Sequence, residues 1–271
     1  MGIGESPTNC WMKIANRGIM PELCAECHAR PAYAEFTKLA LSSDEELRSD
    51  FGRDALPPGG LLFLGRHYAH SRTMLLTLNP TPHAPELPQT PIYTDLYTWG
   101  LHWDGPAKSR YRNFTGGRHL FQGMIDAAPN FASRLALATD TYMVPWPSKN
   151  WASMLLSLSW PAIQERSRAL FERTVADHMP DLLFTTGKTA NTLLWQFMGI
   201  PRPKPVDVWQ SPTRRQWDAE HFQLTNVTVG VTTLPVLDVF RLPHFSRFNR
   251  KQFYAVGGWV AERLPALPIE P

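Results

Sequence analysis

The sequence predicts an α/β fold, a three-layer α/β/α arrangement around a central, mostly parallel sheet, with an N-terminal extension. Two observations lead to this prediction. From Leu61 onward, short apolar runs rich in β-forming residues alternate with amphipathic segments of helical length, which is the pattern of βαβ units. The chain of 271 residues is also long enough to bury a core on both faces of such a sheet.

Residues 1–60 are predicted to be a helical N-terminal extension, and residues 61–271 the main α/β domain. A helix is expected over Ala32–Leu41, and Ser43 with the acidic residues after it is typical of the cap and first turn of a second helix. The run Leu56-Pro57-Pro58-Gly59-Gly60 then breaks the pattern and is expected to act as a hinge.

Within the main domain, apolar patterning predicts the order of strands and helices. The expected strands are Thr73–Leu78, Thr141–Val144, Leu182–Thr186, Val227–Val231 and Val236–Phe240. The expected helices are Arg118–Ala127, Ala162–Met179, Lys188–Phe197 and Arg250–Leu264. Ligands bind beyond the carboxyl ends of the strands in sheets of this kind, so the loops after the strands are where a functional site is expected.

Composition narrows the class of protein. A hydrophobic content of 43% excludes a disordered chain. No apolar run approaches the roughly 18 residues of a membrane span, so no membrane partner is expected. The first residues lack the basic start and apolar stretch of a signal peptide, which favours a cytoplasmic protein, and we expect a monomer. The formal net charge of +3 permits nucleic acid as a partner without requiring it.

The cysteines raise the question of a metal. The chain has 3 of them, a count that is wrong for a disulfide framework and fits a reducing compartment. Together with His28, the residues Cys10, Cys24 and Cys27 could supply four soft ligands to a structural zinc ion or an iron–sulfur cluster. The alternative is three ordinary thiols in the N-terminal extension. Apart from such a structural metal, we expect the protein to need no cofactor.

The loop after the first predicted strand begins Leu78-Asn79-Pro80. Asn79 stands at the end of the strand, and Pro80 forces an extended turn. A carboxamide at this place can orient a water molecule through its carbonyl oxygen without adding charge. The alternative interpretation is an ordinary Asn-Pro turn.

The loop after the last predicted strand concentrates polar, basic and aromatic residues between a strand and a helix. They are His244, Ser246, Arg247, Phe248, Asn249 and Arg250. Either the serine or the asparagine could cap the last helix. A helix N-terminus with arginine and serine beside it is also a typical phosphate site, and the histidine could donate a hydrogen bond to a developing anion.

Taken in order, these two loops resemble the first and second motifs of the uracil-DNA glycosylase superfamily, in its branches with an Asn-Pro first motif and a His-x-Ser second motif. Three further stretches are similar to segments of that superfamily. They are Met143-Val144-Pro145-Trp146-Pro147 at a strand end, Leu182–Thr189 at a strand-to-helix turn, and Arg112-Asn113-Phe114 at a helix start. The resemblance covers residues 73 to 264.

The resemblance implies a DNA glycosylase that hydrolyses the N-glycosidic bond of a flipped base and leaves an abasic site. In that reaction Asn79 would position the attacking water, and His244 would stabilise the departing base by a hydrogen bond. Asp95, close in sequence to the first motif, would be an additional carboxylate near the cationic sugar. Its alternative role is that of an exposed loop or cap residue.

The resemblance also implies residues that hold the base and the DNA backbone. Tyr93 would stack on the flipped base, with Tyr97 as the second candidate. The residues expected to contact DNA are Ser246, Arg247, Phe248, Asn249, Arg250, Lys188 and Arg112. Phe248 or Arg247 would fill the gap that the flipped base leaves.

This sequence departs from the pattern of the superfamily at positions that affect the substrate. Leu78 and Thr81 replace glycines of the first motif, and Phe245 replaces a proline of the second. Tyr142 stands where uracil-specific members have an asparagine, and a phenol lacks the paired donor and acceptor of an amide. We therefore expect a base other than uracil, either a different lesion or a base with a bulky modification such as those of some viral DNAs. Three alternatives stay open. They are a standard uracil or deaminated-base repair glycosylase, a catalytically inactive DNA-binding protein of the same fold, and an unrelated α/β enzyme that acts on free nucleotides or nucleosides.

Overall fold

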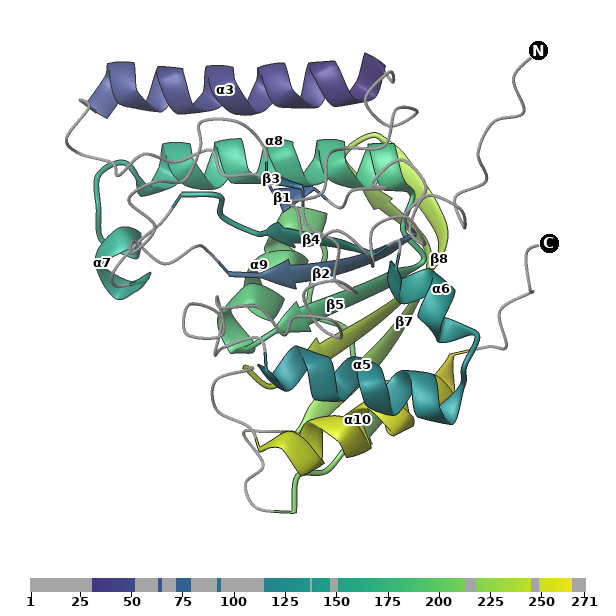
Figure 1. Cartoon of the computed structure of the whole chain (residues 1–271). Helices are drawn as coiled ribbons and strands as arrows, with labels where there is room; N and C mark the ends of the chain where they lie inside the picture. Colours follow the sequence, from purple (N-terminus) through teal and green to yellow (C-terminus); the bar gives the residue numbers. More distant parts are fainter. Residues whose placement is uncertain are drawn as a thin grey trace, which may run out of the picture.

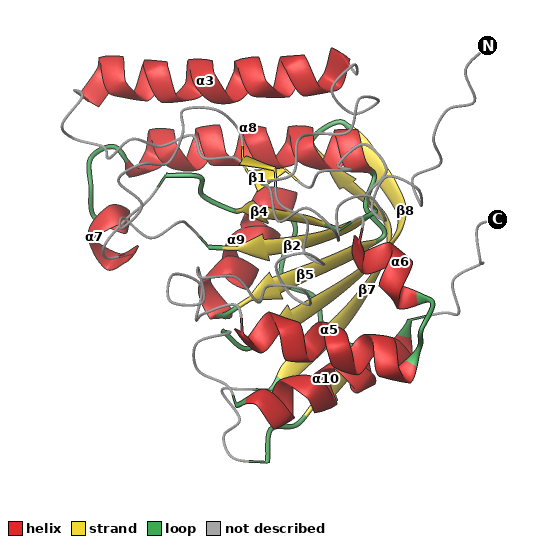
Figure 2. Ribbon diagram, viewed as in Figure 1, coloured by secondary structure: helices red, strands yellow, loops and turns green. Residues whose placement is uncertain are grey.

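The computed structural model describes residues 31–51, 63–64, 72–78, 92–93, 115–136, 138–146, 151–212, 218–244 and 249–264. These residues form an α/β fold with a six-stranded, mixed and mostly parallel sheet (Figure 1). Helices lie on both faces of the sheet, which is compatible with the predicted three-layer arrangement (Figure 2).

The order of strands in the sheet is β4-β2-β5-β8-β7-β6. The strands are β2 (Thr73–Thr77), β4 (Thr139–Tyr142), β5 (Leu182–Thr186), β6 (Asp207–Trp209), β7 (Ala219–Val229) and β8 (Thr232–Leu242). The first four in the order are parallel, whereas β7 is antiparallel to both of its neighbours. A separate parallel pair consists of β1 (Phe63–Leu64) and β3 (Ile92–Tyr93).

The described helices flank the sheet or connect its strands. They are α3 (Pro31–Phe51), α5 (Thr115–Ala127), α6 (Phe131–Ala136), α7 (Trp151–Leu155), α8 (Trp160–His178), α9 (Lys188–Met198) and α10 (Arg250–Arg263). One face of the sheet is covered by α8 and α9, and the other by α5, α6 and α10 (Figure 1). Helix α3 lies on the outer side of α8 (Figure 1).

Two buried clusters, one on each face, surround the sheet. In β2, Met74 and Leu76 point into the cluster under α8 and α9, and Leu75 points into the cluster under α5 and α10. All three are fully buried. A strand buried on both faces reads as a continuous apolar run, and this explains why the sequence predicts β2 and β5 so well.

Helices α5 and α10 approach each other closely through two glycines. A Cβ atom on Gly123 would overlap the carbonyl oxygen of Tyr254, and a Cβ atom on Gly257 would overlap the carbonyl oxygen of Leu120. The hydroxyl of Tyr254 also donates a hydrogen bond to Asp126 over 2.7 Å. Only glycine permits this backbone-to-backbone contact.

The prediction of two helices in the N-terminal extension is wrong, because α3 is one continuous helix from Pro31 to Phe51. Ser43 does not cap a second helix. Its hydroxyl instead donates to the carbonyl oxygen of Leu39 over 2.7 Å, a bond within the helix. Glu46 forms an ion pair with Arg166 of α8, and Leu47 is buried in the cluster under α8 and α9.

Most predicted elements are confirmed, with changed bounds. Strand β5 has the predicted bounds, β4 lies two residues earlier than expected, and β7 and β8 are longer than expected. The sequence did not predict β6, α6 or α7. Among the described helices, none is both long enough and apolar enough to cross a bilayer.

Candidate functional site

The order of strands places a topological switch point at the carboxyl ends of β2 and β5. β2 comes first along the chain in the six-stranded sheet, the next strand β4 lies on one side of it, and β5 lies on the other. The connections therefore leave β2 and β5 in opposite directions. Ligands of open α/β sheets bind at such a switch point, outside the carboxyl ends of the strands.

Polar side chains from three neighbouring strands meet at this edge. The register pairs Thr77 with Tyr142, and it pairs Thr186 with Leu242 of β8. Leu76 pairs with Thr185, so Thr77 and Thr186 are level with each other. Alternation along the strands directs Thr77, Tyr142 and Thr186 to the face covered by α5 and α10. The three side chains form a polar row, which we call the Thr77–Tyr142–Thr186 row.

A glycine turn joins β5 to α9 at the same edge. Gly187 has φ 83° and ψ 161°, a conformation that residues with a side chain rarely adopt, and its N–H donates to the carbonyl oxygen of Leu242 over 2.8 Å. The ring of His244 lies against this turn, since a Cβ atom on Gly187 would be 3.6 Å from its Cδ2 atom. The exposed His244 thus stands beside the start of α9.

Of the helices that the structure describes, α5, α8, α9 and α10 begin at this edge (Figure 1). His178 at the end of α8 contacts Thr139 at the start of β4, so α8 begins at the other end of that strand, its carboxyl end. α9 follows β5 directly, and α10 follows β8. The partial positive charges of these four helix N-termini therefore all lie at the carboxyl edge, on the two faces of the sheet.

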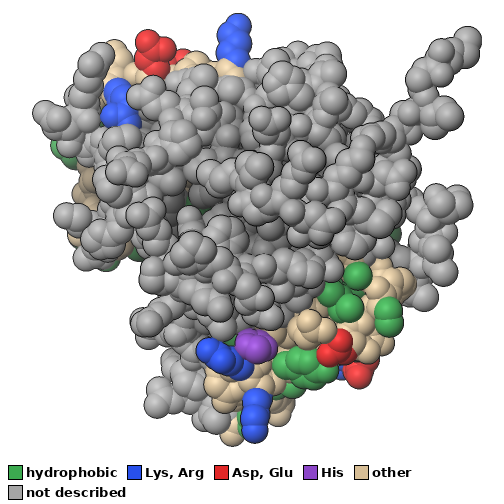
Figure 3. Space-filling model, viewed as in Figure 1, with side chains coloured by type: hydrophobic (Ala, Val, Ile, Leu, Met, Phe, Trp, Pro, Cys, Tyr) green, Lys and Arg blue, Asp and Glu red, His purple; other side chains and the backbone are tan. Residues whose placement is uncertain are grey.

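The first turns of α9 and α10 carry positive side chains. None of the four has Asp or Glu in its described first turn. Lys188 begins α9, Arg250 and Lys251 begin α10, and all three are exposed. Cations at a helix N-terminus are unfavourable for the helix. Figure 3 shows Lys or Arg side chains and a histidine over the starts of α5 and α10, with acidic side chains toward their ends.

Many predicted site residues lie outside the described part of the chain. They are Asn79, Asp95, Tyr97, Arg112, Ser246, Arg247, Phe248, Cys10, Cys24, Cys27 and His28. Tyr93 lies in β3, where it pairs with Leu64. Asn249 is the N-cap of α10, and its side chain accepts a hydrogen bond from the backbone N–H of Gln252 over 2.9 Å. Of the two candidates for that cap, the asparagine is therefore confirmed.

The structure brings Tyr142, Lys188 and His244 to one edge of the sheet. Tyr142 ends β4 and is half-buried. It lies three strand positions from β8, a span of about 14 Å. Sequence reasoning missed Thr77 and Thr186. The signal for them was a threonine that ends an apolar run just before Leu-Asn-Pro or Gly-Lys.

Within the described ranges, no group of three or more His, Cys, Asp or Glu side chains is placed to hold a metal ion. The predicted zinc ligands are all in the segment before residue 31, which the structure does not describe. The zinc site therefore stays a prediction.

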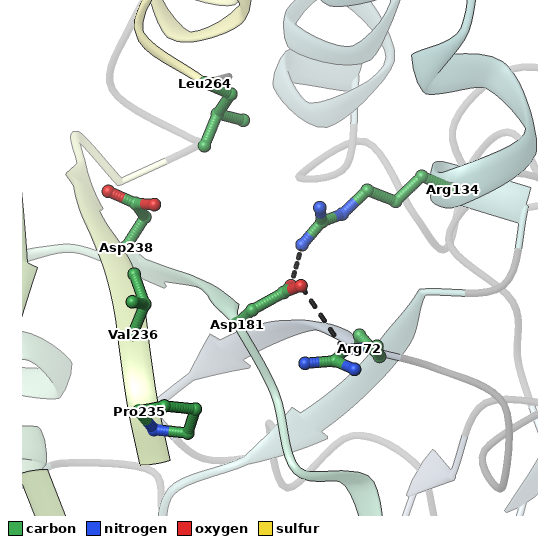
Figure 4. Close-up of a pocket in the computed structure, with 7 residues that line it drawn as sticks. All are labelled: Arg72, Arg134, Asp181, Pro235, Val236, Asp238 and Leu264. Atoms are coloured by element: carbon green, nitrogen blue, oxygen red, sulfur yellow. Dashed lines mark hydrogen bonds and ion pairs between the residues drawn. The ribbon is translucent and has the colours of Figure 1, made fainter. Parts of the chain in front are cut away.

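A cavity of about 200 Å³ lies at the opposite, amino edge of the sheet (Figure 4). Asp181 forms ion pairs there with Arg72 and Arg134, and Arg134 also donates to the hydroxyl of Thr73 over 2.6 Å. Burial lowers the pKa of Arg134, against the opposing effect of Asp181. These charges bind one another and join α6 to the starts of β2 and β5, which is a structural role.

Two histidines are buried away from the carboxyl edge, His221 within the sheet and His178 at the end of α8. His221 lies 2.7 Å from Asp238 and stacks on Phe240 with ring centroids 4.3 Å apart. His178 lies between the carbonyl oxygen of Thr174 and the hydroxyl of Thr139, and burial lowers its pKa to about 4. A neutral ring suits that position, because its two nitrogens donate and accept one bond each.

Comparison with models of known protein families finds no family that matches this chain, and comparison with curated proteins finds no similar protein.

Proposed function

We propose that the chain is a DNA glycosylase, which hydrolyses the N-glycosidic bond of a flipped non-standard or modified base and leaves an abasic site. One juxtaposition carries the proposal. The Thr77–Tyr142–Thr186 row lies at the carboxyl edge where β2 leads into the Asn-Pro motif, and His244 stands beside the start of α9 at the same edge. The resemblance of the sequence to the uracil-DNA glycosylase superfamily supports the same assignment.

The charge at this edge supports a polyanionic substrate. Lys188, Arg250 and Lys251 are exposed where the dipoles of their helices disfavour a cation. Phosphates that bind there would meet both the backbone N–H groups of the helix starts and these side chains. Contacts of this kind position a protein on DNA without reading its sequence.

The proposed reaction adds water across the glycosidic bond. Asn79, two residues after β2, positions a water molecule whose oxygen forms a bond to the sugar C1′. The electron pair of the breaking bond leaves with the base, which then takes up a proton, while the water loses one to solvent. His244, two residues after β8, donates a hydrogen bond to the anionic base. Asp95 is assigned to the neighbourhood of the cationic sugar, and Tyr93 or Tyr97 to stacking on the base.

The substrate proposed is a base other than plain uracil. Tyr142 ends β4 beside Thr77, at the polar row where the base is expected to sit. A phenol cannot offer an adjacent donor and acceptor to a pyrimidine edge. This favours a lesion or a hypermodified base, such as those of some viral DNAs.

A catalytically inactive DNA-binding protein is the second candidate, and one observation favours it. Leu78 takes the place of a glycine of the superfamily and packs against the cluster under α8 and α9. A leucine there leaves less room for the sugar to approach the backbone.

Excision screening separates the two candidates. Single- and double-stranded oligonucleotides would carry uracil, hypoxanthine, alkylated bases, or hydroxymethylated or glucosylated cytosine, and alkali would cleave the abasic product. A glycosylase gives an alkali-labile break on at least one substrate. Retention of DNA with no break on any of them contradicts the enzyme and supports the binding protein.

A further inference from the structure

Three leucines at the end of α7 and in the turn before α8 are exposed to solvent. Leu155 is 42% exposed, Leu156 is 86% exposed and Leu158 is 94% exposed. Isolated exposed leucines are common on protein surfaces, but these three fall within four consecutive residues. We call Leu155, Leu156 and Leu158 the leucine tip.

The leucine tip is held in a fixed conformation. Trp151 and Trp160, on either side of it, stack edge to face with ring centroids 5.1 Å apart. The hydroxyl of Ser157 donates to the carbonyl oxygen of Met154 over 2.7 Å and lies 3.1 Å from the hydroxyl of Ser159. The N–H of Trp160 donates to the carbonyl oxygen of Ser157. A tip that is ordered in advance loses little conformational entropy when it binds.

The leucine tip projects beyond the carboxyl edge of the sheet. It immediately precedes α8, which has 19 residues and a length of about 28 Å. The end of α8 is level with the start of β4, at the amino edge of the sheet. From there the sheet extends only about 17 Å, the length of the 5 residues of β2. The start of α8 thus lies roughly 10 Å past the strand ends, and α7 is drawn beyond the arrowheads in Figure 1.

We propose that the leucine tip inserts into the base stack of bound DNA, an inference that rests on the proposed function. The tip stands at the same edge of the sheet as Lys188, Arg250 and Lys251. DNA whose phosphates bind these cations would therefore also contact the tip. A base cannot leave the duplex without unstacking, and leucine is one of the side chains that separate base steps. This apolar contact is additional to the one assigned to Phe248 or Arg247.

The test uses the full chain and a double variant, Leu156→Ser with Leu158→Ser. The probe is a duplex that holds a stable tetrahydrofuran abasic analogue next to 2-aminopurine, whose fluorescence rises when it unstacks. The control is Val231→Ser, a residue 99% exposed at the turn between β7 and β8, on the amino side of the sheet. Affinity is measured by fluorescence anisotropy at several salt concentrations.

We expect the double variant to bind the duplex about tenfold more weakly and to lose most of the 2-aminopurine signal. Its salt dependence should equal that of the parent, because every cation that faces a phosphate is still present. The Val231→Ser control should behave as the parent does. A double variant that binds and unstacks the duplex like the parent overturns the inference. A parent chain without salt-dependent binding to the duplex overturns the proposed function as well.

Discussion

Gly257 of α10 lies directly over the carbonyl oxygen of Leu120 in α5, where no side chain fits between the two helices. Gly123 makes the reciprocal contact with the carbonyl oxygen of Tyr254. The pair of glycines sets how closely α5 and α10 pack, and so where the two helices begin at the carboxyl edge.

Replacing Gly257 by alanine should destabilise the fold, because the new Cβ atom would force the backbones of α5 and α10 apart. We expect a loss of about 1–3 kcal/mol in the free energy of unfolding. Gly258→Ala is the matched control. Nothing lies within 4 Å of its added Cβ, so helix propensity should stabilise it by up to about 1 kcal/mol. Urea unfolding midpoints measure both, and equal midpoints would contradict the close contact.

The buried His178 should make stability depend on pH. Its pKa is lowered to about 4 in the folded chain, from the usual 6.5, because burial disfavours the charged ring. The folded state therefore binds this proton less readily than the unfolded state does. The contribution of His178 to the free energy of unfolding is fully present above pH 6.5 and is lost as the pH falls toward 4. The loss is on the order of 3 kcal/mol.

The variant His178→Gln isolates this contribution. The difference between its free energy of unfolding and that of the parent, measured by chemical denaturation, should change between pH 6.5 and 4. Other titrating groups cancel in that difference. A difference that stays constant over this range would show that the histidine does not titrate there.

The ion pairs of the amino-edge cavity should contribute unequally. Arg134 is largely buried and binds both Asp181 and Thr73, so Arg134→Ala should cost about 3 kcal/mol of stability. Arg72 is mostly exposed, and Arg72→Ala should cost less than about 1 kcal/mol. Thermal unfolding compares the two. The Arg72→Ala variant should still excise the base from DNA. A loss of excision in this variant would indicate that the active site lies in this cavity.

Removing the cations at the helix starts should have opposite effects on binding and on stability. In Lys188→Ala with Lys251→Ala, DNA affinity should fall, and the slope of log affinity against log salt should decrease by about 1 for each phosphate that is no longer neutralised. The helices themselves should gain about 0.3–1 kcal/mol per cation removed. Lys204→Ala, an exposed residue after the end of α9, serves as the control. A slope equal to that of the parent would contradict a phosphate role.

Asn79→Ala and His244→Ala should each reduce excision at least about 100-fold while DNA affinity changes little, since both residues are assigned to the transition state. Single-turnover excision assays with anisotropy binding curves measure the two effects separately. Asn130→Ala, an exposed residue between α5 and α6, is the control. Excision at the parent rate by either variant would refute that residue's assignment.

The elements that the sequence predicted best are those buried on both faces. All five residues of β5 are buried, so the apolar run and the strand coincide. Strands β7 and β8 extend beyond their predicted bounds because their additional residues, many of them exposed, pair through the backbone, which side-chain patterning does not report. The strand β4 ends at Tyr142, although the apolar Met143 and Val144 still donate backbone hydrogen bonds to Thr77 and Leu78.

The residues of the candidate site could be predicted from the sequence only in part. His244 and Lys188 could be singled out because they follow predicted strands in loops rich in polar residues. Thr77 and Thr186 were missed, although each ends an apolar run, because the sequence does not give the register between β2 and β5 that brings them level. The cap predicted at Ser43 was wrong because a serine before acidic residues suits a cap, yet it also suits a helix interior where its hydroxyl bonds to the turn before it.

The buried position of Leu47 has a consequence for any shortened form of the protein. Leu47 belongs to the cluster under α8 and α9, and Leu39 and Phe51 pack against the same cluster. A polypeptide trimmed to begin at residue 61 would present the former partners of these side chains to water. Such a truncated form would then be prone to self-association through a surface that the intact chain never exposes.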